Sequence, residues 1–592
     1  RGAPTTIGRA VVEASRGERA ALFLGLLAAF VAAVEAIDRI RLDLLLDPEP
    51  SWLPARLTLL LVVAAAAGSA GVLAASLGFG AARSRWGSRN AVPLPLDRSS
   101  VFLLGAAILA IGVLLRIYGA GTLAPLYFDE LSEVRPAAAL RGALADVPPW
   151  THPVPFREGR WGGSVGTLYL ETFRLSLRTF GTTIEGVRAP SVLGGILSLF
   201  TAALLGRAFL PRGGGMLTIL ALAGMRWNLI VSQWGWNAVV LAPILDLAAL
   251  AMLEARRRER VSLAVISGSI AGLGAHVYLA SWIGAAALGL WATWPSATAK
   301  FSRRAYLGGA FLGGFLLVVF PLVRDDPFGR YFSRTADNSR TLGFTPVSRA
   351  WWRVQTAEAA VTGPWWTPDG NARHDLPGRS RLGWIVGAAL AAALLRAILH
   401  PRDELSAYLL ASAACALLAS MAWGRSGTPN TYRSAYLSTT TALAAAAGVM
   451  WLLSAIRQPR RRLAAGLAVG ALAISGALGA RDALLVWPVH RATFDGFGGG
   501  DTLLGQAASR WDRYGTVRID TSVEGSRVIV EAVRASRVAP FGAADVGPAK
   551  PLGASIRLVG PGVDPGVSER VVERIRDGWG REYGRVLASS LF

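Results

Sequence analysis

Long stretches without a charged residue dominate this chain. Twenty-six uncharged residues separate Arg56 from Arg83, and 23 separate Arg433 from Arg457. The hydrocarbon core of a bilayer is about 30 Å thick and takes roughly 20 residues of helix to cross, whereas soluble helices rarely run so far without a charge. The pattern therefore predicts a polytopic α-helical membrane protein.

About thirteen segments have the length and apolarity of a membrane span. The uncharged stretch 261–299 holds 39 residues, about 58 Å as one helix, so we expect two helices joined by a tight turn. Arg226 interrupts the apolar run 214–232. The predicted spans are 20–37, 55–79, 100–118, 187–210, 214–232, 237–254, 261–279, 281–295, 305–323, 382–398, 405–423, 435–455 and 461–485.

Short clusters of basic residues lie between these segments. With the N-terminus in the cytoplasm, alternation of the spans puts every cluster on the inner side, as the positive-inside rule requires. We therefore expect a multi-pass protein of the cytoplasmic membrane with outer loops at 119–186 and 324–381. The clusters are 83–98, 207–212, 256–260, 300–304, 396–402 and 457–462.

Three domains follow from this topology: an N-terminal extra pair of helices (1–99), a transmembrane domain (100–485) and an extracytoplasmic C-terminal domain (486–592). Within the first outer loop, Thr167–Phe180 has the pattern of an interfacial helix, because apolar residues alternate with arginines. The C-terminal domain has alternating runs broken by glycine and proline, which predict a small mixed α/β fold. Its expected strands are Thr516–Thr521, Arg527–Val533 and Ser555–Val559, followed by a helix at 567–576.

The composition fits a membrane protein, with 52% hydrophobic and 17% charged residues. The net charge of +22 does not indicate a nucleic-acid partner, because many of the basic residues sit in the short inter-span clusters. A single cysteine, Cys415, and five scattered histidines exclude a disulfide framework and a zinc site built from those ligands. No cofactor is indicated, and a divalent metal held by other ligands stays open.

The most informative string is Tyr127-Phe128-Asp129-Glu130, just beyond the outer end of span 100–118. Two acids beside aromatic residues lie at the depth where an amphiphilic substrate presents its head group, and a carboxylate there can take a proton from a hydroxyl nucleophile. The alternative is a solvated acidic pair at a helix end. A further acid, Asp246, lies inside an apolar run, and a carboxylate there is a functional candidate because it is costly in lipid. Its position near a span end, where an arginine partner or the membrane surface is within reach, favours a structural role over a proton relay.

Other strings follow in a consistent order. Thr151-His152-Pro153-Val154-Pro155 precedes the interfacial helix, which leads to Phe180-Gly181 and then Arg188-Ala189-Pro190-Ser191 at the entry to a span. Later come Gly272 to Ala280 with Tyr278, Gly370-Asn371-Ala372-Arg373-His374-Asp375, and Pro429-Asn430-Thr431-Tyr432-Arg433. This order resembles the GT-C superfamily of membrane glycosyltransferases, in particular the bacterial branch similar to protein mannosyltransferases (glycosyltransferase family 39). The likeness covers roughly residues 100–510, and Asp375 stands where asparagine is more usual.

The resemblance implies an inverting transfer, on the outer face of the membrane, from a polyprenyl-phosphate-linked sugar to an acceptor hydroxyl. The acceptor is a protein, a lipid or a polysaccharide. In this resemblance Asp129 is the general base, and Glu130 orients it or contacts the acceptor.

Arginines on outer turns are the candidates for the donor phosphate, because guanidinium groups bind phosphate in a two-pronged way. Arg433 is the first, followed by Arg373 with His374. His152, Arg157, Arg160 and Tyr278 are candidates for substrate contacts. The arginines have a simpler explanation, since an arginine at a span end can extend its charge to the membrane surface and loop arginines are usually solvated. The outer-loop tryptophans 351, 352, 365 and 366 could stack on a sugar or line an acyl-chain groove.

Two other functions compete with the glycosyltransferase. A secondary transporter or lipid-linked sugar flippase also has many spans, but it is expected to show inverted repeats and broken helices at matching positions of two halves. Neither is evident in the sequence. A non-catalytic envelope scaffold would leave the placement of Asp129 and Glu130 without a role.

Overall fold

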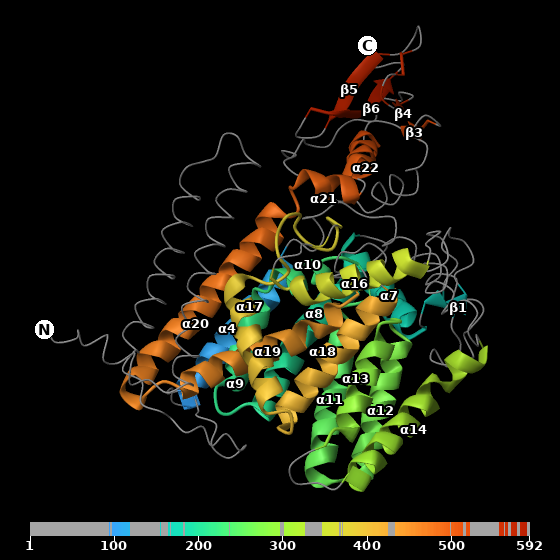
Figure 1. Cartoon of the computed structure of the whole chain (residues 1–592). Helices are drawn as coiled ribbons and strands as arrows, with labels where there is room; N and C mark the ends of the chain where they lie inside the picture. The colour runs from blue at the N-terminus through green and yellow to red at the C-terminus, as the bar shows by residue number, and fades with distance from the viewer. Residues whose placement is uncertain are drawn as a thin grey trace, which may run out of the picture.

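The protein is a helical body with a small sheet near its C-terminus (Figure 1). The structure is a computed structural model, and it describes 94, 98–118, 154–155, 164–165, 167–180, 184–235, 237–295, 301–325, 346–365, 369, 371–423, 433–497, 499–512, 517–520, 556–559, 561, 563–565, 570–576 and 580–588. The predicted spans 20–37 and 55–79 lie outside the described residues.

Helices occupy the charge-free stretches that the structure describes, and further helices form outside these stretches. They are α4 (Arg98–Ile117), α7 (Thr167–Phe180), α8 (Ile184–Phe209), α9 (Gly214–Ala223), α10 (Arg226–Ser232), α11 (Leu241–Arg258), α12 (Val261–Ala275), α13 (Ser281–Thr293), α14 (Phe301–Asp325), α16 (Pro346–Thr362), α17 (Trp384–Leu399), α18 (Glu404–Trp423), α19 (Ser438–Ser454), α20 (Gln458–Arg481), α21 (Arg491–Gly496) and α22 (Gly499–Trp511). The two helices α12 and α13 confirm the predicted division of the stretch 261–299.

Among the described residues, five helices are long and apolar enough to cross a membrane, and the number rises to seven if each of two bent pairs is one span. The body also exposes many large apolar side chains, such as Phe102 (74% exposed), Leu317 (73%) and Leu418 (64%). Patches of that kind are rare on soluble monomers, and they suit contact with lipid tails. The chain is therefore membrane-embedded. Helices α12 and α13 have only 15 and 13 residues, which is too short for a full span each.

The predicted span 214–232 is wrong as a single helix. It is broken into α9 and α10, whose axes differ by 65°. At the end of α9 the Leu222 carbonyl accepts the amide of Met225 at 3.2 Å, and Arg116 of α4 donates to the carbonyls of Leu222 and Ala223, each at 3.3 Å. Arg116 is fully buried. The break therefore involves two arginines: Arg226, which interrupts the apolar run in the sequence, and Arg116, which binds the carbonyls at the break.

The helix predicted at Thr167–Phe180 is confirmed as α7, with the predicted bounds. Phe173 is buried against the body, whereas Leu175 on another side of the helix is 64% exposed. Two hydrogen bonds hold α7 in place: the amide of Tyr169 donates to the carbonyl of His276 at 3.4 Å, and the Ser176 hydroxyl donates to the carbonyl of Gly186 at 2.6 Å.

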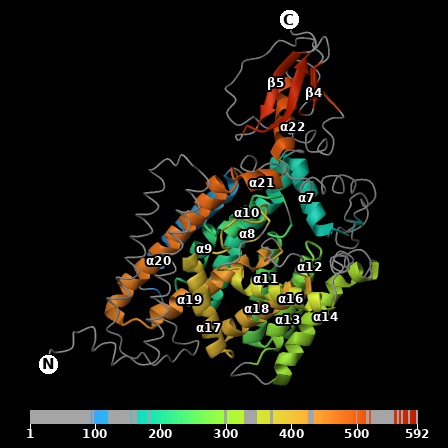
Figure 2. The ribbon, with the colours of Figure 1, turned by 45° about the horizontal axis from the view of Figure 1, so that its top comes forward.

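The C-terminal sheet has the strand order β3-β4-β6-β5 and extends from one end of the body beyond α21 and α22 (Figures 1 and 2). The strands are β3 (Val517–Ile519), β4 (Ile556–Val559), β5 (Arg570–Arg576) and β6 (Glu582–Ala588). β3 pairs with β4 in parallel, and the other pairs are antiparallel. The side chains of Leu504 and Ala507 from α22 pack with Ile556 and Val586 in a core of their own.

This sheet confirms two expected strands and corrects one element. β3 and β4 lie inside the predicted runs, and 527–533 lies outside the described residues. The helix predicted at 567–576 is wrong, because residues 570–576 form β5 and pair with β6. The sequence Arg-Val-Val-Glu-Arg-Ile-Arg is rich in β-branched residues, which favour a strand. Two register irregularities in this pair disturb the strict alternation that would have indicated a strand.

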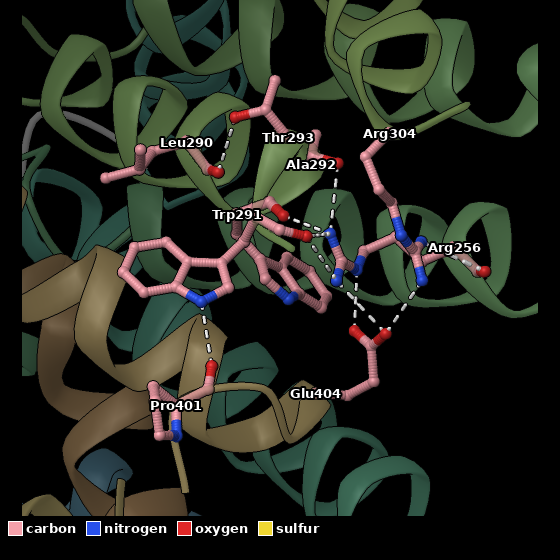
Figure 3. A network of polar contacts seen from close by, with 9 residues as sticks. Arg256, Leu290, Trp291, Ala292, Thr293, Arg304, Pro401 and Glu404 are labelled. Atoms are coloured by element: carbon pink, nitrogen blue, oxygen red, sulfur yellow. Dashed lines mark hydrogen bonds and ion pairs between the residues drawn. The ribbon is translucent and has the colours of Figure 1, made fainter. Parts of the chain in front are cut away.

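Two buried arginines join the ends of helices α11, α13, α14 and α18 (Figure 3). Arg256 at the end of α11 pairs with Glu404 at the start of α18 at 2.6 Å and donates to the carbonyl of Ala292 at 3.1 Å. Arg304 of α14 reaches the same carboxylate at 3.2 Å. Arg256 and Arg304 are 2% and 3% exposed, so these two members of the predicted basic clusters hold four helices together as well as carrying loop charge.

Asp246 of α11 is buried deep between helices. Its two carboxylate oxygens accept hydrogen bonds from Thr201 of α8 at 2.6 Å and from Thr439 of α19 at 2.7 Å. Two threonine hydroxyls satisfy this acid inside the bundle, in place of an arginine or the membrane surface, and these contacts fit the structural role that the sequence favours. Asp246 thus cross-links three helices.

Candidate functional site

A largely apolar cavity of about 510 Å³ lies among α16, α17, α18 and α19. Leucine side chains supply much of its apolar wall, and Trp365 also lines it. The residues Arg381, Arg433 and Ser434 add polar groups to the lining. The apolar lining includes Ile283, Leu390, Leu394, Leu409, Leu410 and Leu417.

Arg381 is held on the cavity wall by two contacts. Its guanidinium lies over the ring of Trp227, 5.0 Å from the centroid, and donates to the Ser434 hydroxyl at 3.2 Å. Burial lowers the pKa of Arg381, while the carboxylates of Asp369 and Asp375 act in the opposite direction. A guanidinium that has lost much of its water binds an incoming anion more strongly than an exposed one does.

Arg433 is the predicted phosphate ligand, and it lines the same cavity as Arg381. It is half-buried and directly precedes Ser434, the residue that accepts the hydrogen bond from Arg381. The preceding residues of its turn, 424–432, lie outside the described residues. Two arginines from segments about 50 positions apart in the sequence thus line one cavity.

Arg373 and His374 do not line this cavity. They belong to a segment we call the arginine loop (371–383), which also holds Arg379 and Arg381. His374 Nδ1 lies 3.2 Å from a carboxylate oxygen of Asp369, and Nε2 lies 3.3 Å from the side-chain amide of Asn371. Arg373 donates to the Asn371 side-chain oxygen at 3.1 Å. Both predicted ligands are therefore engaged by residues close to them in the sequence.

The arginine loop is also fixed by the segment after α20. The Trp487 indole N–H donates to the carbonyl of Ala372 at 2.8 Å, and the Thr493 hydroxyl approaches the same carbonyl at 3.4 Å. The ring of Trp234 packs between His374 and Phe497, at centroid distances of 5.6 Å to each. The C-terminal region and the membrane helices thus meet at this loop.

A buried ion-pair network lies at the base of the loop. Arg226, the first residue of α10, pairs with Asp375 at 2.7 Å and with Asp482 at 3.3 Å. Burial raises the pKa of the Asp375 carboxyl, and the Arg226 guanidinium acts in the opposite direction. Both carboxylates have no exposed side-chain area, so the pairing compensates charges that water does not reach.

Tyr278 lies in the turn between α12 and α13, away from the cavity lining. Its amide donates to the carbonyl of Gly274 at 3.0 Å, and the Asn237 side chain donates to the carbonyl of the neighbouring Val277 at 3.0 Å. The remaining candidates, Asp129, Glu130, His152, Arg157 and Arg160, lie outside the described residues.

Sequence reasoning missed Arg381 and Arg226 as site residues. Arg381 stands in an arginine-rich stretch beside a predicted span end, where an arginine at the membrane surface is the ordinary expectation. Arg226 had a signal, since it is a charge inside an apolar run. Within the described ranges no group of three or more histidine, cysteine, aspartate and glutamate residues could hold a metal ion.

No known protein family matches the chain, and no curated protein matches its sequence. Among solved structures, ArnT from Cupriavidus metallidurans in the apo state is similar with a TM-score of 0.47 and 14% identity, over 83% of this chain and 98% of ArnT. The oligosaccharyltransferase AglB from Archaeoglobus fulgidus is similar with a TM-score of 0.45 and 14% identity, over 77% of this chain and 62% of AglB. These likenesses are too distant to assign a fold or an activity.

Proposed function

We propose that this protein is a membrane glycosyltransferase. It moves a sugar from a polyprenyl-phosphate-linked donor to an acceptor hydroxyl, with inversion, at the outer face of the cytoplasmic membrane. The order of motifs that resembles the GT-C superfamily supports the reaction type. The acceptor is a protein, a lipid or a polysaccharide, and membership of the branch similar to protein mannosyltransferases is part of this proposal.

The cavity is the observation that carries the donor assignment. A polyprenyl phosphate has a long apolar chain and one anionic head, and the cavity offers a leucine-rich wall together with Arg381 and Arg433. The polyprenyl chain enters the cavity from the bilayer and not from water, so van der Waals packing against the leucine side chains favours its binding. Guanidinium–phosphate contacts are charge-assisted and about twice as strong as neutral hydrogen bonds. Both parts of the donor thus find a matching surface.

The reaction then needs one base and one anion site. Asp129 takes the proton of the acceptor hydroxyl, whose oxygen forms a bond to the anomeric carbon of the sugar. The bond between that carbon and the phosphate oxygen breaks on the opposite side, so the configuration inverts. Arg433 and Arg381 stabilise the charge that develops on the departing phosphate. Glu130 orients Asp129 or contacts the acceptor.

Orientation belongs to the same proposal. The N-terminus lies in the cytoplasm and the C-terminal domain outside, because this arrangement puts the basic clusters on the inner side. Arg256, Arg304 and Glu404 then lie at the cytoplasmic ends of their helices, and the arginine loop lies at the outer end. The extracytoplasmic sheet is joined to the site through the contacts of Trp487 and Thr493 with Ala372.

The test uses the full chain in lipid nanodiscs with a polyprenyl-phosphate sugar as donor. Transfer and donor binding are measured for Arg433→Ala, Arg381→Ala and Arg433→Lys. Each alanine variant should lower turnover about 10²-fold or more, with a smaller loss of donor affinity, because charge on the phosphate grows in the transition state. Lysine should restore only part of the activity, since it keeps the charge but loses the two-pronged geometry.

Arg402→Ala is the matched control. Arg402 is an exposed arginine between α17 and α18, at the other end of α17 from Arg381, and its loss should leave both measurements unchanged. If Arg433→Ala and Arg381→Ala also leave turnover and donor binding unchanged, the donor phosphate is not held in this cavity.

A lipid-linked sugar flippase is the second candidate, and the break between α9 and α10 favours it. Transporters often bind substrates at the ends of broken helices. Here, however, Arg116 already fills the carbonyl end of the break. The two functions differ in product: a flippase moves an intact lipid-linked sugar across a vesicle membrane, whereas the transferase releases polyprenyl phosphate. Movement of the intact donor with no release would favour the flippase.

A further inference from the structure

Arg226 makes an unusual number of contacts for one buried side chain. It is 5% exposed and begins α10, directly after the helix break. Its Nε donates to Asp375 at 2.7 Å and one terminal nitrogen donates to Asp482 at 3.3 Å. The other terminal nitrogen donates to the second oxygen of Asp375 at 3.4 Å and also to the backbone carbonyl of Ser380.

These contacts hold the arginine loop at two points. Asp375 lies near its middle, and its carboxylate also accepts the amide of Leu376 at 2.8 Å, which fixes the local backbone. Ser380 is held by its carbonyl, and the next residue is Arg381. The Arg226 guanidinium therefore fixes the backbone of residues 376–380, which lead to Arg381.

The same helix holds Arg381 directly. Trp227 follows Arg226 in α10, and its ring lies under the Arg381 guanidinium at 5.0 Å. Two consecutive residues of α10 thus contact two consecutive residues of the loop. Arg226 donates to the carbonyl of Ser380, and the Trp227 ring packs against the guanidinium of Arg381. The arginine side chain then reaches Ser434 at 3.2 Å on the cavity wall.

We propose that Arg226 and Asp375 are positioning residues that present Arg381 to the phosphate end of the cavity. This inference rests on the proposed function. Arg226 is not a second phosphate ligand, because its nitrogens are engaged by Asp375, Asp482 and Ser380. Asp482 anchors the arrangement to the end of α20, since it begins the π-helical turn Asp482–Val486 that follows that helix.

A positioning role and a merely structural role predict different behaviour. If the ion pair is merely structural, its removal lowers the stability of the fold and weakens the binding of any lipid to the cavity. A positioning pair acts through Arg381, so its removal matters for an anionic head group and not for the apolar chain. It also loses its effect once Arg381 is absent, which a double-mutant cycle measures.

The experiment measures binding of two probes to the full chain in nanodiscs: a polyprenyl monophosphate and the corresponding polyprenol without phosphate. The variants are Asp375→Asn, Arg381→Ala and the double variant. Asp375→Asn should weaken phosphate binding about 10-fold, the scale of a charge-assisted hydrogen bond, and leave polyprenol binding unchanged. The double variant should bind the phosphate no more weakly than Arg381→Ala alone.

Asp403→Asn is the matched control, because Asp403 also pairs with a buried arginine, Arg396, at 3.1 Å but lies at the opposite end of α17. It should alter thermal stability without changing the phosphate preference. If Asp375→Asn does not fold, Arg226→Lys replaces it, since lysine keeps the charge but cannot reach Asp375 and Ser380 together.

The outcomes separate the two proposals. Additive losses in the double variant, or equal losses for both probes, would overturn the positioning role. Full phosphate binding by Asp375→Asn beside a loss in Arg381→Ala overturns it too, and leaves the cavity as the donor site. Full phosphate binding by Arg381→Ala and Arg433→Ala overturns the donor site itself.

Discussion

Gly224 and Gly476 bring two helical segments into backbone contact. Gly224 lies in the break between α9 and α10, and a Cβ built there would be 2.1 Å from the carbonyl oxygen of Gly476 in α20. The contact is continued by Gly479, whose Cβ would lie 2.2 Å from the Gly224 carbonyl oxygen. Real side chains cannot approach so closely, so the crossing of α20 over the break requires glycine.

We therefore expect Gly224→Ala to destabilise the protein by about 1–3 kcal/mol, because α20 must move away to make room for a methyl group. Thermal unfolding in detergent, followed by circular dichroism, measures the loss. Gly313→Ala in α14 is the control, since nothing lies within 4 Å of a Cβ there. That change should be neutral or stabilising by up to about 1 kcal/mol, because alanine favours a helix. Equal stability of the two variants would contradict the close crossing.

The junction of Arg256 and Glu404 gives a second stability prediction. Arg256→Gln leaves the Glu404 carboxylate with only Arg304 and removes the donors to the carbonyls of Ala292 and Trp294. The Glu404 side chain is 30% exposed and keeps one arginine, so we expect a cost of about 1.5–3 kcal/mol, the scale of hydrogen bonds to a charged group. We expect a large drop in the unfolding temperature, measured as for Gly224→Ala.

Arg258→Gln provides the comparison at this junction. Arg258 lies two residues further along α11 but is 58% exposed, and it pairs with Glu254 on the same helix. Such surface pairs contribute about 0.3–0.5 kcal/mol. If both variants unfold at the same temperature, Arg256 is a loop charge like its neighbours and the junction does not hold the helices together.

The places of most helices could be predicted because lipid removes the ambiguity of a soluble sequence. A charge-free stretch of about 20 residues has few options other than a helix. Helix α7 was also predictable, because its arginines and apolar residues divide between two surroundings. The number of helices that cross the membrane could not be predicted, since α12 and α13 fall short of a full span.

Tertiary contacts determine what the sequence pattern could not. The break after Ala223 depends on Arg116, which is 107 residues distant from it in the chain. The strand β5 depends on its pairing with β6 and could not be inferred from a seven-residue run.

The residues that line the cavity could be predicted only in part. Arg433 was selected as an arginine on an outer turn, and it lines the cavity. Arg381 has the same chemistry, but its place beside Arg433 depends on Trp227 and the arginine loop, which the chain brings together from different segments. Such a meeting of distant segments leaves no local pattern.

Glu582 predicts how the C-terminal sheet responds to acid. Arg585 donates to it at 2.5 Å, and Arg576 and Arg574 lie at 3.5 and 3.8 Å. The hydrogen bond from Arg585, with the nearby arginine charges, holds the pKa of this carboxyl below its ordinary value of 4.5. Because the folded-state pKa is lowered, the stabilisation is fully present above pH 4.5 and is lost as pH falls through the folded-state pKa.

Hydrogen–deuterium exchange of peptides from β5 and β6, corrected for the intrinsic rate at each pH, measures this effect. Protection should fall below pH 4.5 in the native chain. Glu582→Gln should show weaker protection near neutral pH and a smaller change on acidification. A native-like acid response in Glu582→Gln would assign the effect to another carboxyl group.

Orientation is tested by reporter fusions that are active on one side of the membrane only. Fusions after residues 90, 258 and 460 should report the cytoplasm, and fusions after residues 145, 350 and 540 should report the exterior, because of the placement of the basic clusters. The fusion after 258 is decisive, since it follows Arg256 and Arg258 at the end of α11. An external signal there would invert the side assigned to the cavity arginines.

Asp129 carries the chemical step of the proposal, so its removal gives the sharpest prediction on activity. Asp129→Asn keeps the size of the side chain but cannot accept a proton, and turnover should fall by about 10²–10⁴. Binding of the polyprenyl-phosphate sugar should stay within a few-fold of native, because the donor phosphate is assigned to Arg381 and Arg433. This pattern is the opposite of Asp375→Asn, which is expected to weaken phosphate binding. Near-native transfer by Asp129→Asn would remove it as the base, and Glu130→Gln would then be the next variant to measure.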